Sequence, residues 1–175
     1  MSYDIITYGD PVLRQKASPV EEIDDGIRQL SQDMLEAMYA KNGLGLAAEQ
    51  IGRTEAISVI DVKQEDDAAH DNPNIPMPLV VINPTIIEMS GEETGQEGCL
   101  SFPEIYVSIK RAAEVTFTFL DLDGNEQTLK VKGLLARVVQ HEVDHLNGFL
   151  LVDRMSAVQK VAVAGKLKRL KKANY

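Results

Sequence analysis

The sequence has 175 residues, 44% hydrophobic and 26% charged, which is enough apolar chain for one domain with its own core. Its formal net charge of −9 disfavours non-specific binding of nucleic acid by the body of the protein. A single cysteine excludes an internal disulfide framework, and no apolar run of about 18 residues could span a membrane.

These features lead us to expect one domain over residues 1–175, monomeric, cytoplasmic and not associated with a membrane. The first 20 residues contain several Gly, Asp and Pro residues and predict irregular chain that wraps the core. From about Asp24 to Lys41, apolar residues recur with helical spacing. Asp24 or Asp25 can cap this predicted N-terminal helix, and Gly43 lies just past its end.

A segment with three glycines, NGLGLAAEQIG at residues 42–52, follows this helix. Two of the glycines flank Leu44, which indicates a backbone that approaches another group closely or adopts positive φ. The third glycine of a dinucleotide-binding fingerprint is missing, and no strand precedes the segment. It is either a loop that turns into a strand or the wall of an active site whose backbone pairs with an extended ligand.

Strands are predicted through the middle of the chain by short runs of β-branched and aromatic residues. These runs are 56–62, 79–82, 84–89, 115–120 and 127–131. An acidic segment interrupted by proline, residues 63–78, is expected to be an exposed loop. Asp123-Gly124 predicts a hairpin turn between the last two strands. Because hairpins and loops connect the strands instead of helical crossovers, we expect an α+β domain with mainly antiparallel sheets.

Two further helices are predicted towards the end of the chain. Residues 134–147 contain no proline or internal glycine, carry apolar residues at helical spacing and are followed by Gly148. Residues 156–175 repeat the helical pattern after a capping Ser156. Basic residues crowd the end of this last helix: Lys166, Lys168, Arg169, Lys171 and Lys172.

The helix at 134–147 carries a His-Glu-x-x-His pattern. His141 and His145 are four residues apart and share one helix face, so that both imidazoles can bind one metal ion. Glu142 can reach a water on that ion and carry protons, as in metal-assisted hydrolases. The alternative is a solvated helix face that happens to carry two histidines.

A catalytic metal site of this kind needs a third protein ligand. In one large peptidase class a histidine follows downstream, but Leu151 occupies that position here and no glutamate follows His145. The third ligand must therefore come from upstream, where Cys99 lies between Gly98 and Pro103. A thiolate is a strong ligand for a divalent ion. The alternative for Cys99 is a small buried apolar residue.

Three segments in this order, GLGLAAEQIG, EGCLSFP and QHEVDHLNG, resemble those of peptide deformylases. The N-terminal DPVLRQKASPV is also similar to the entry segment of that family. The resemblance implies a metal-dependent hydrolase that removes the N-formyl group from the initiator methionine of nascent proteins. It implies antiparallel sheets packed around a central metal-binding helix, and the C-terminal helix resembles that of the bacterial type.

The resemblance also implies roles for individual residues. The implied metal ligands are Cys99, His141 and His145. Glu142 would be the general acid and base, and Gln50 with the backbone N–H of Leu100 would stabilise the oxyanion. One divalent ion is implied, typically Fe2+, with Zn2+, Ni2+ or Co2+ as substitutes.

Substrate contacts are implied for the glycine-containing wall formed by Gly43, Leu44 and Gly45. Val138 and Leu134, one and two turns before His141, could line a slot for the methionine side chain or could be ordinary core residues. Arg137 could line the entrance with its stem or face solvent. Glu97 and Arg111 resemble a buried ion pair of the family, against the alternative of a weak surface pair.

Three positions depart from the commonest family pattern: Glu49, Phe102 and Tyr106. They leave the metal and acid–base positions unaltered but put substrate preference in doubt. The basic C-terminal helix either faces solvent and complements its own dipole, or docks on ribosomal RNA as in bacterial relatives. The competing functions are a metallopeptidase that cuts internal peptide bonds and a non-catalytic relative that binds metal or peptides.

Overall fold

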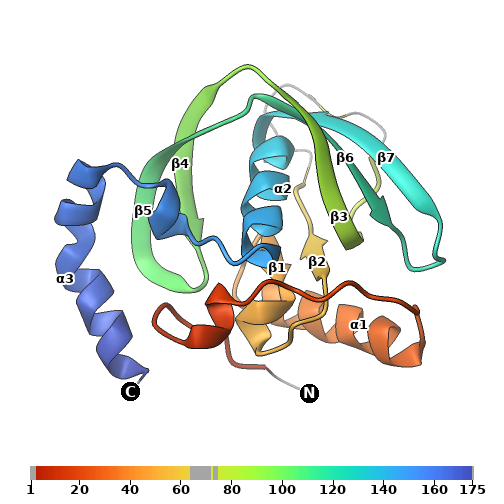
Figure 1. Ribbon diagram of the computed structural model, residues 1–175, viewed down its shortest axis with the longest axis horizontal. Coiled ribbons are helices and arrows are strands. Elements are labelled where there is room, and N and C mark those ends of the chain that lie inside the picture. The colour runs from red at the N-terminus through yellow and green to blue at the C-terminus, as the bar shows by residue number, and fades with distance from the viewer. Residues whose placement is uncertain (1–2, 64–71, 73–74, 175) are drawn as a thin grey trace.

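Two antiparallel sheets pack around a central helix in the computed structural model of the protein (Figure 1). The structure describes residues 3–63, 72 and 75–174. The helices and strands are α1 (Asp25–Ala40), β1 (Gly45–Ala47), β2 (Ile57–Ile60), β3 (Leu79–Ser90), β4 (Glu93–Cys99), β5 (Phe102–Arg111), β6 (Glu114–Leu120), β7 (Glu126–Lys132), α2 (Gly133–Leu146) and α3 (Ala157–Ala173). Short 3₁₀ helices are η1 (Pro11–Arg14), η2 (Ala48–Ile51) and η4 (Leu151–Arg154). The predicted α+β class with mainly antiparallel sheets is confirmed.

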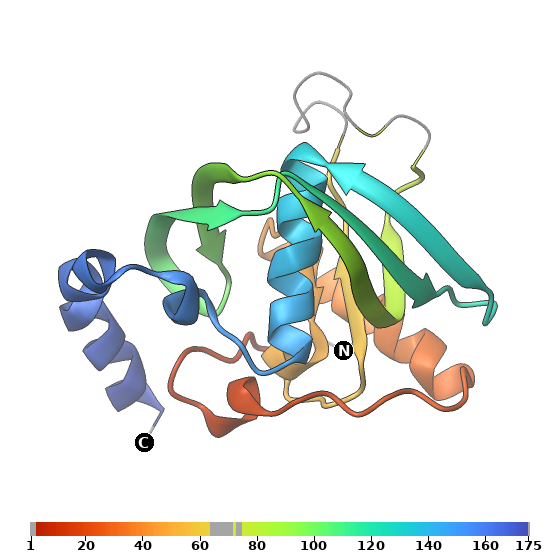
Figure 2. The same cartoon turned by 45° about the horizontal axis from the view of Figure 1, so that its top comes forward.

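The larger sheet has the strand order β1-β2-β3-β6-β7, and β4 pairs with β5 in a separate two-stranded sheet. The β4–β5 hairpin is inserted between β3 and β6, which pair with each other across it. Figure 2 shows α2 running between the two sheets, with the curved β4–β5 hairpin on one side and the larger sheet on the other. Residues at the end of β4 can therefore meet residues on α2.

The central helix α2 is buried because its apolar residues pack against the larger sheet. Leu135 and Val139 belong to a core cluster that also contains Phe117 and Val131 of the β6–β7 hairpin. Burial of side chains of this size contributes roughly 1.5–3 kcal/mol each. The helix spans Gly133–Leu146, one residue earlier at each end than the 134–147 predicted from the sequence.

The N-terminal helix α1 covers the other side of β1 and β2. Asp24 is the N-cap, and its Oδ1 accepts a hydrogen bond of 2.9 Å from the backbone N–H of Ile27. Leu30, Met34 and Met38 are buried on one face of the helix, in the same cluster as residues of β2. The predicted amphipathic helix and its cap are confirmed.

The sequence patterns did not predict β4 and β5 as strands. Gly95, Gly98 and Pro103 interrupt them, and such residues ordinarily indicate loops. The ring of Tyr106 on the paired strand packs over Gly98, where a Cβ atom would lie 2.6 Å from it. The alternation of the apolar residues Ile105, Val107 and Ile109 with other residues is the sequence signal that could have identified β5.

The C-terminal helix α3 lies against the β5 side of the molecule (Figure 1). Ser156 caps it through a hydrogen bond of 3.2 Å from the Gln159 backbone N–H. Leu167 and Leu170 pack on a cluster that contains residues of β5 and η4. No helix in the described part of the chain is long and apolar enough to cross a membrane. Most of the predicted acidic loop at 63–78 lies outside the described residues.

We predict that Gly148→Ala destabilises the fold. Gly148 follows α2 with φ of +80°, and an added Cβ atom would lie 2.6 Å from the backbone carbonyl oxygen of Arg14. The left-handed conformation alone costs an alanine about 1–2 kcal/mol, and the clash adds to this. Urea unfolding measures the loss.

The control is Gly165→Ala in the exposed part of α3, where the nearest side-chain atom to the new Cβ is 3.7 Å away. This change should stabilise the protein by up to about 1 kcal/mol through helix propensity. Equal unfolding free energies for the two variants would contradict the account of Gly148.

Candidate active site

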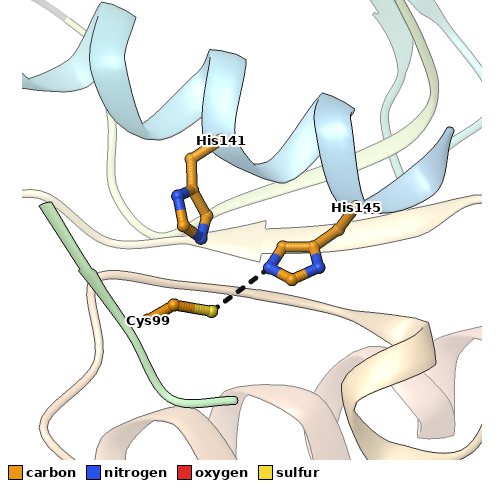
Figure 3. A group of neighbouring side chains, drawn as sticks. All are labelled: Cys99, His141 and His145. Atoms are coloured by element: carbon orange, nitrogen blue, oxygen red, sulfur yellow. Dashed lines mark hydrogen bonds between the residues drawn. The ribbon is translucent and has the colours of Figure 1, made fainter. Parts of the chain in front are cut away.

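Three potential metal ligands converge where the end of β4 meets α2. His141 and His145 lie on successive turns of α2 with ring centroids 5.0 Å apart. Cys99 ends β4, and its Sγ lies 3.4 Å from Nε2 of His145. One ligand atom from each of the three residues lies within 4.8 Å of the others (Figure 3). A sulfur and two imidazole nitrogens form a donor set that suits a divalent transition metal.

Nδ1 of His141 already contacts a carboxylate, which leaves Nε2 for a metal ion. Nδ1 of His141 is 3.0 Å from Oε1 of Glu97. A carboxylate in this position fixes the ring orientation and the tautomer of a metal-ligating histidine. The residues present therefore fit a metal ion.

Glu97 is the centre of a buried cluster of ion pairs. Nε and Nη2 of Arg111 each donate a hydrogen bond of 2.8 Å to its two carboxylate oxygens, and Nη1 of Arg137 donates one of 2.7 Å. Burial by itself would raise the pKa of Glu97, but the hydrogen bonds from Arg111 and His141 hold the pKa well below its usual range. Glu97 is thus a carboxylate anion, and its pairing with Arg111 is buried.

The same cluster extends towards the surface through Asp144. Arg111 donates a hydrogen bond of 2.7 Å to Oδ2 of Asp144, and Arg154 donates two more, of 2.9 and 2.6 Å. Arg137, for which the sequence left two placements open, is buried and also donates to the backbone carbonyls of Glu93 and Ile109. Its guanidinium therefore ties α2 to the β4–β5 hairpin.

Burial also changes the pKa values of the two histidines. Burial and the nearby charge of His141 lower the pKa of His145 well below its usual value, which favours the neutral imidazole that a metal requires. Burial acts in the same direction on His141, but attraction to Cys99 and the hydrogen bond with Glu97 raise its pKa well above the usual value.

The Gln50 amide is held in a fixed orientation beside Cys99. Its Oε1 accepts a hydrogen bond of 3.0 Å from the Ala47 backbone N–H, and its Nε2 donates one of 3.1 Å to Oγ of Ser101. The same Nε2 lies 3.6 Å from Sγ of Cys99. Gln50 is 1% exposed, so these contacts fix a polar N–H group within the site.

Glu142 is a buried carboxyl group beside the cluster of ligands. It is 3% exposed, and its Oε2 lies 3.2 Å from Oγ of Ser58 on β2. Burial raises the pKa of Glu142 to about 7, although His141 and Ser58 act in the opposite direction. A carboxyl group with this pKa can both accept and release a proton near neutral pH.

A cleft of about 740 Å³ opens onto these residues. Its volume lies in the usual range for a ligand-binding pocket. All of the predicted site residues except His145 line it: Gly43, Leu44, Gly45, Gln50, Cys99, Leu100, Leu134, Val138, His141 and Glu142. His145 is 1% exposed and lies beneath the cleft. A peptide end can therefore approach Glu142 and the exposed side of the ligand cluster.

Ser58 was not singled out from the sequence, and Arg137 was named there without its partner. Ser58 contacts Glu142, and its only sequence signal is a hydroxyl within the otherwise apolar strand Ile57–Ile60. Arg137 lines the cleft and contacts Glu97, and its signal is one charge within an apolar helical stretch. Neither signal predicts the contact of Ser58 with Glu142 or of Arg137 with Glu97, because these partners are far apart in the sequence.

Comparison with known proteins identifies the family. The sequence model of the polypeptide deformylase family matches residues 2–161. A peptide deformylase of Dictyoglomus thermophilum is 50% identical over 88% of this chain and 93% of that protein. A peptide deformylase of Rickettsia typhi is 46% identical over 97% of this chain and 96% of that protein. The chain belongs to the peptide deformylase family.

Solved structures of peptide deformylases share the fold. That of Ehrlichia chaffeensis has a TM-score of 0.88 at 36% identity and covers 99% of both chains. That of Synechococcus elongatus, a complex with actinonin, has a TM-score of 0.83 at 43% identity and covers 94% of this chain and 87% of that one. The protein is thus a metal-dependent hydrolase that removes the N-formyl group from nascent polypeptides. Neither a peptidase nor a non-catalytic relative is favoured.

Gly45→Ala should lower activity without unfolding the protein. A Cβ atom at position 45 would lie 2.7 Å from Oε1 of Glu142 and would displace that carboxyl group. We expect deformylation of a formyl-Met peptide to fall at least about tenfold, since proton transfer depends on the position of this group. Unchanged turnover, with circular dichroism showing a native fold, would contradict the role of the close contact.

Proposed function

We propose that Cys99, His141 and His145 bind one divalent metal ion and that the cleft above them is where the formyl group is hydrolysed. The observation that carries this proposal is the convergence of Sγ and two imidazole nitrogens within 4.8 Å. A bound ion would supply a Lewis acid that polarises the formyl carbonyl and lowers the pKa of water at the site. Fe2+ is the proposed ion, with Zn2+, Ni2+ or Co2+ as substitutes.

Glu142 is the proposed proton carrier of the reaction. Its carboxylate takes a proton from the attacking water, and the oxygen of that water forms the new bond to the formyl carbon. When the carbon–nitrogen bond breaks, Glu142 delivers the proton to the leaving amine, and formate departs. A pKa of about 7 supports both steps near neutral pH.

Gln50 and Leu100 are proposed to stabilise the charge that develops on the formyl oxygen. Nε2 of Gln50 already points at the ligand cluster, since it lies 3.6 Å from Sγ of Cys99. Leu100 follows Cys99 and lines the cleft, which supports this role for its backbone N–H. Losing one such donor typically costs about 3 kcal/mol of transition-state stabilisation.

The substrate is proposed to lie along the cleft as an extended chain. Gly43, Leu44 and Gly45 would pair with its backbone, and Leu134 and Val138 would contact the methionine side chain. All five residues line the cleft. An apolar slot beside a polar reaction centre fits a formylmethionyl end.

Glu142→Ala is predicted to bind metal normally but to lose almost all turnover. General acid–base groups typically contribute 10²–10⁴-fold in rate, so we expect formate release from a formyl-Met peptide to fall by about that factor. Metal content is measured in parallel. The control is Glu126→Ala on the exposed start of β7, which should retain full activity. Formate release at the normal rate by the Glu142 variant would refute its role.

We also propose that residues 1–175 act as one monomeric catalytic domain in the cytoplasm, close to the ribosome. The basic end of α3 supports ribosome contact, because Lys168, Arg169 and Lys172 are exposed. Other basic groups nearby contact the protein itself: Lys166 donates a hydrogen bond to the Glu104 carbonyl. Exposed cations on one helix can pair with phosphates of ribosomal RNA.

Replacing Lys168, Arg169 and Lys172 together by Glu should weaken co-sedimentation with ribosomes by about tenfold or more at physiological salt. A matched control replaces Lys63, Lys130 and Lys132 by Glu, which changes the net charge equally but away from α3. Both variants should retain activity on a free formyl-Met peptide. Equal ribosome binding by the two variants would contradict a contact through α3.

A further inference from the structure

Glu49 is a buried acidic residue to which the proposed reaction gives no role. It lies in η2, directly before Gln50, and is 0% exposed. Neither of its carboxylate oxygens has a hydrogen-bond partner within the described residues. Burial raises the pKa of Glu49 to about 8; the residue's own backbone N–H acts against this shift, and the charge of Glu142 acts with it. Because an unpartnered buried carboxyl group is costly, its presence requires a physical reason.

A second polar group at the site also lacks a partner. In the described part of the chain, Nδ1 of His145 is the one other buried side-chain atom of this kind. The opposite nitrogen, Nε2, faces Sγ of Cys99 (Figure 3). If Nε2 binds a metal ion, the ring proton must be on Nδ1. Nδ1–H of His145 is then a hydrogen-bond donor with no acceptor. The carboxylate oxygens of Glu49 are acceptors with no donor.

The elements that carry these two groups pack against each other. η2 contacts α2, and Ala47, two residues before Glu49, shares a buried cluster with Leu146, the neighbour of His145. Gln50 directly follows Glu49, and its Nε2 lies 3.6 Å from Sγ of Cys99. That sulfur in turn lies 3.4 Å from Nε2 of His145. η2, which carries Glu49, therefore packs against α2, which carries His145, and Glu142 on α2 is near enough for its charge to act on Glu49.

We propose that Glu49 is a positioning residue that accepts a hydrogen bond from Nδ1–H of His145, directly or through one shared water, when His145 binds the metal. The inference rests on the proposed metal ligation by His145. It gives the second histidine the arrangement that Glu97 already gives His141. Such an acceptor fixes the tautomer and orientation of the ring and makes the nitrogen a stronger ligand.

Glu49 differs from Glu97 in how its charge is balanced. Arg111 and Arg137 neutralise Glu97, but within the described residues no cation pairs with Glu49. A divalent ion bound by His145 would supply the missing positive charge. Glu49 is therefore expected to strengthen metal binding while weakening the metal-free fold.

Two substitutions separate the parts of this proposal. Glu49→Gln keeps an acceptor oxygen but removes the charge. Glu49→Met keeps a similar side-chain size but removes the acceptor oxygen and the charge. Metal affinity is measured by chelator competition with Co2+, and thermal unfolding is followed in metal-free protein. Glu49→Met should bind Co2+ about 10–100-fold more weakly than the original protein, with Glu49→Gln between the two. Metal-free Glu49→Met should unfold at an equal or higher temperature.

NMR of the Co2+ form gives a readout that does not depend on activity. The exchangeable ring N–H proton of His145 should exchange with solvent faster in Glu49→Met, whereas Glu49→Gln should protect it. Equal Co2+ affinity and equal proton exchange in all three proteins would overturn the inference. If the original protein bound no metal, the proposed function itself would fail. If Glu49→Met does not fold, the Co2+ affinity of Glu49→Gln alone decides: weaker binding supports the inference and unchanged binding overturns it.

Discussion

The ion-pair cluster around Glu97 is the interaction on which the rest of the site depends. Glu97 lies on β4, two residues before Cys99, and it accepts hydrogen bonds from Arg111 on β5 and from Arg137 on α2, besides contacting His141. One carboxylate therefore connects the β4–β5 hairpin to the central helix. Removing one partner from a buried ion pair typically costs about 3–5 kcal/mol, because the remaining charge stays buried without compensation.

The fold explains why the groups proposed to carry the reaction lie close together. α2 supplies two imidazoles and Glu142, the end of β4 supplies the thiol, and η2 supplies the Gln50 amide. Each of these groups is held by a contact from a different element: Ser58 on β2 contacts Glu142, and Ser101 contacts Gln50. The cleft leaves one side of this assembly open to a peptide, while His145 remains beneath it. The proposed proton carrier Glu142 is the direct neighbour of the proposed metal ligand His141 on α2.

Local patterns predicted α1, α2, α3 and the β6–β7 hairpin, because helical spacing, caps and turn residues act over a few residues. The β4–β5 hairpin was missed, since local rules interpret Gly98 and Pro103 as signs of a loop, whereas both lie in strands that pair with each other. Likewise, the contact of Arg137 with Glu97 spans 40 residues and has no local signature. The motif residues were identified by residue type and spacing, whereas their supporting contacts required the three-dimensional structure.

X-ray absorption at the metal edge of anaerobically purified protein is the most direct measurement of the metal centre. It counts sulfur and nitrogen neighbours of the ion without relying on activity. The account predicts about one ion per chain with one sulfur and two imidazole nitrogens among its nearest neighbours. A metal ion with no sulfur neighbour, or protein that retains no metal while remaining fully active, would contradict it.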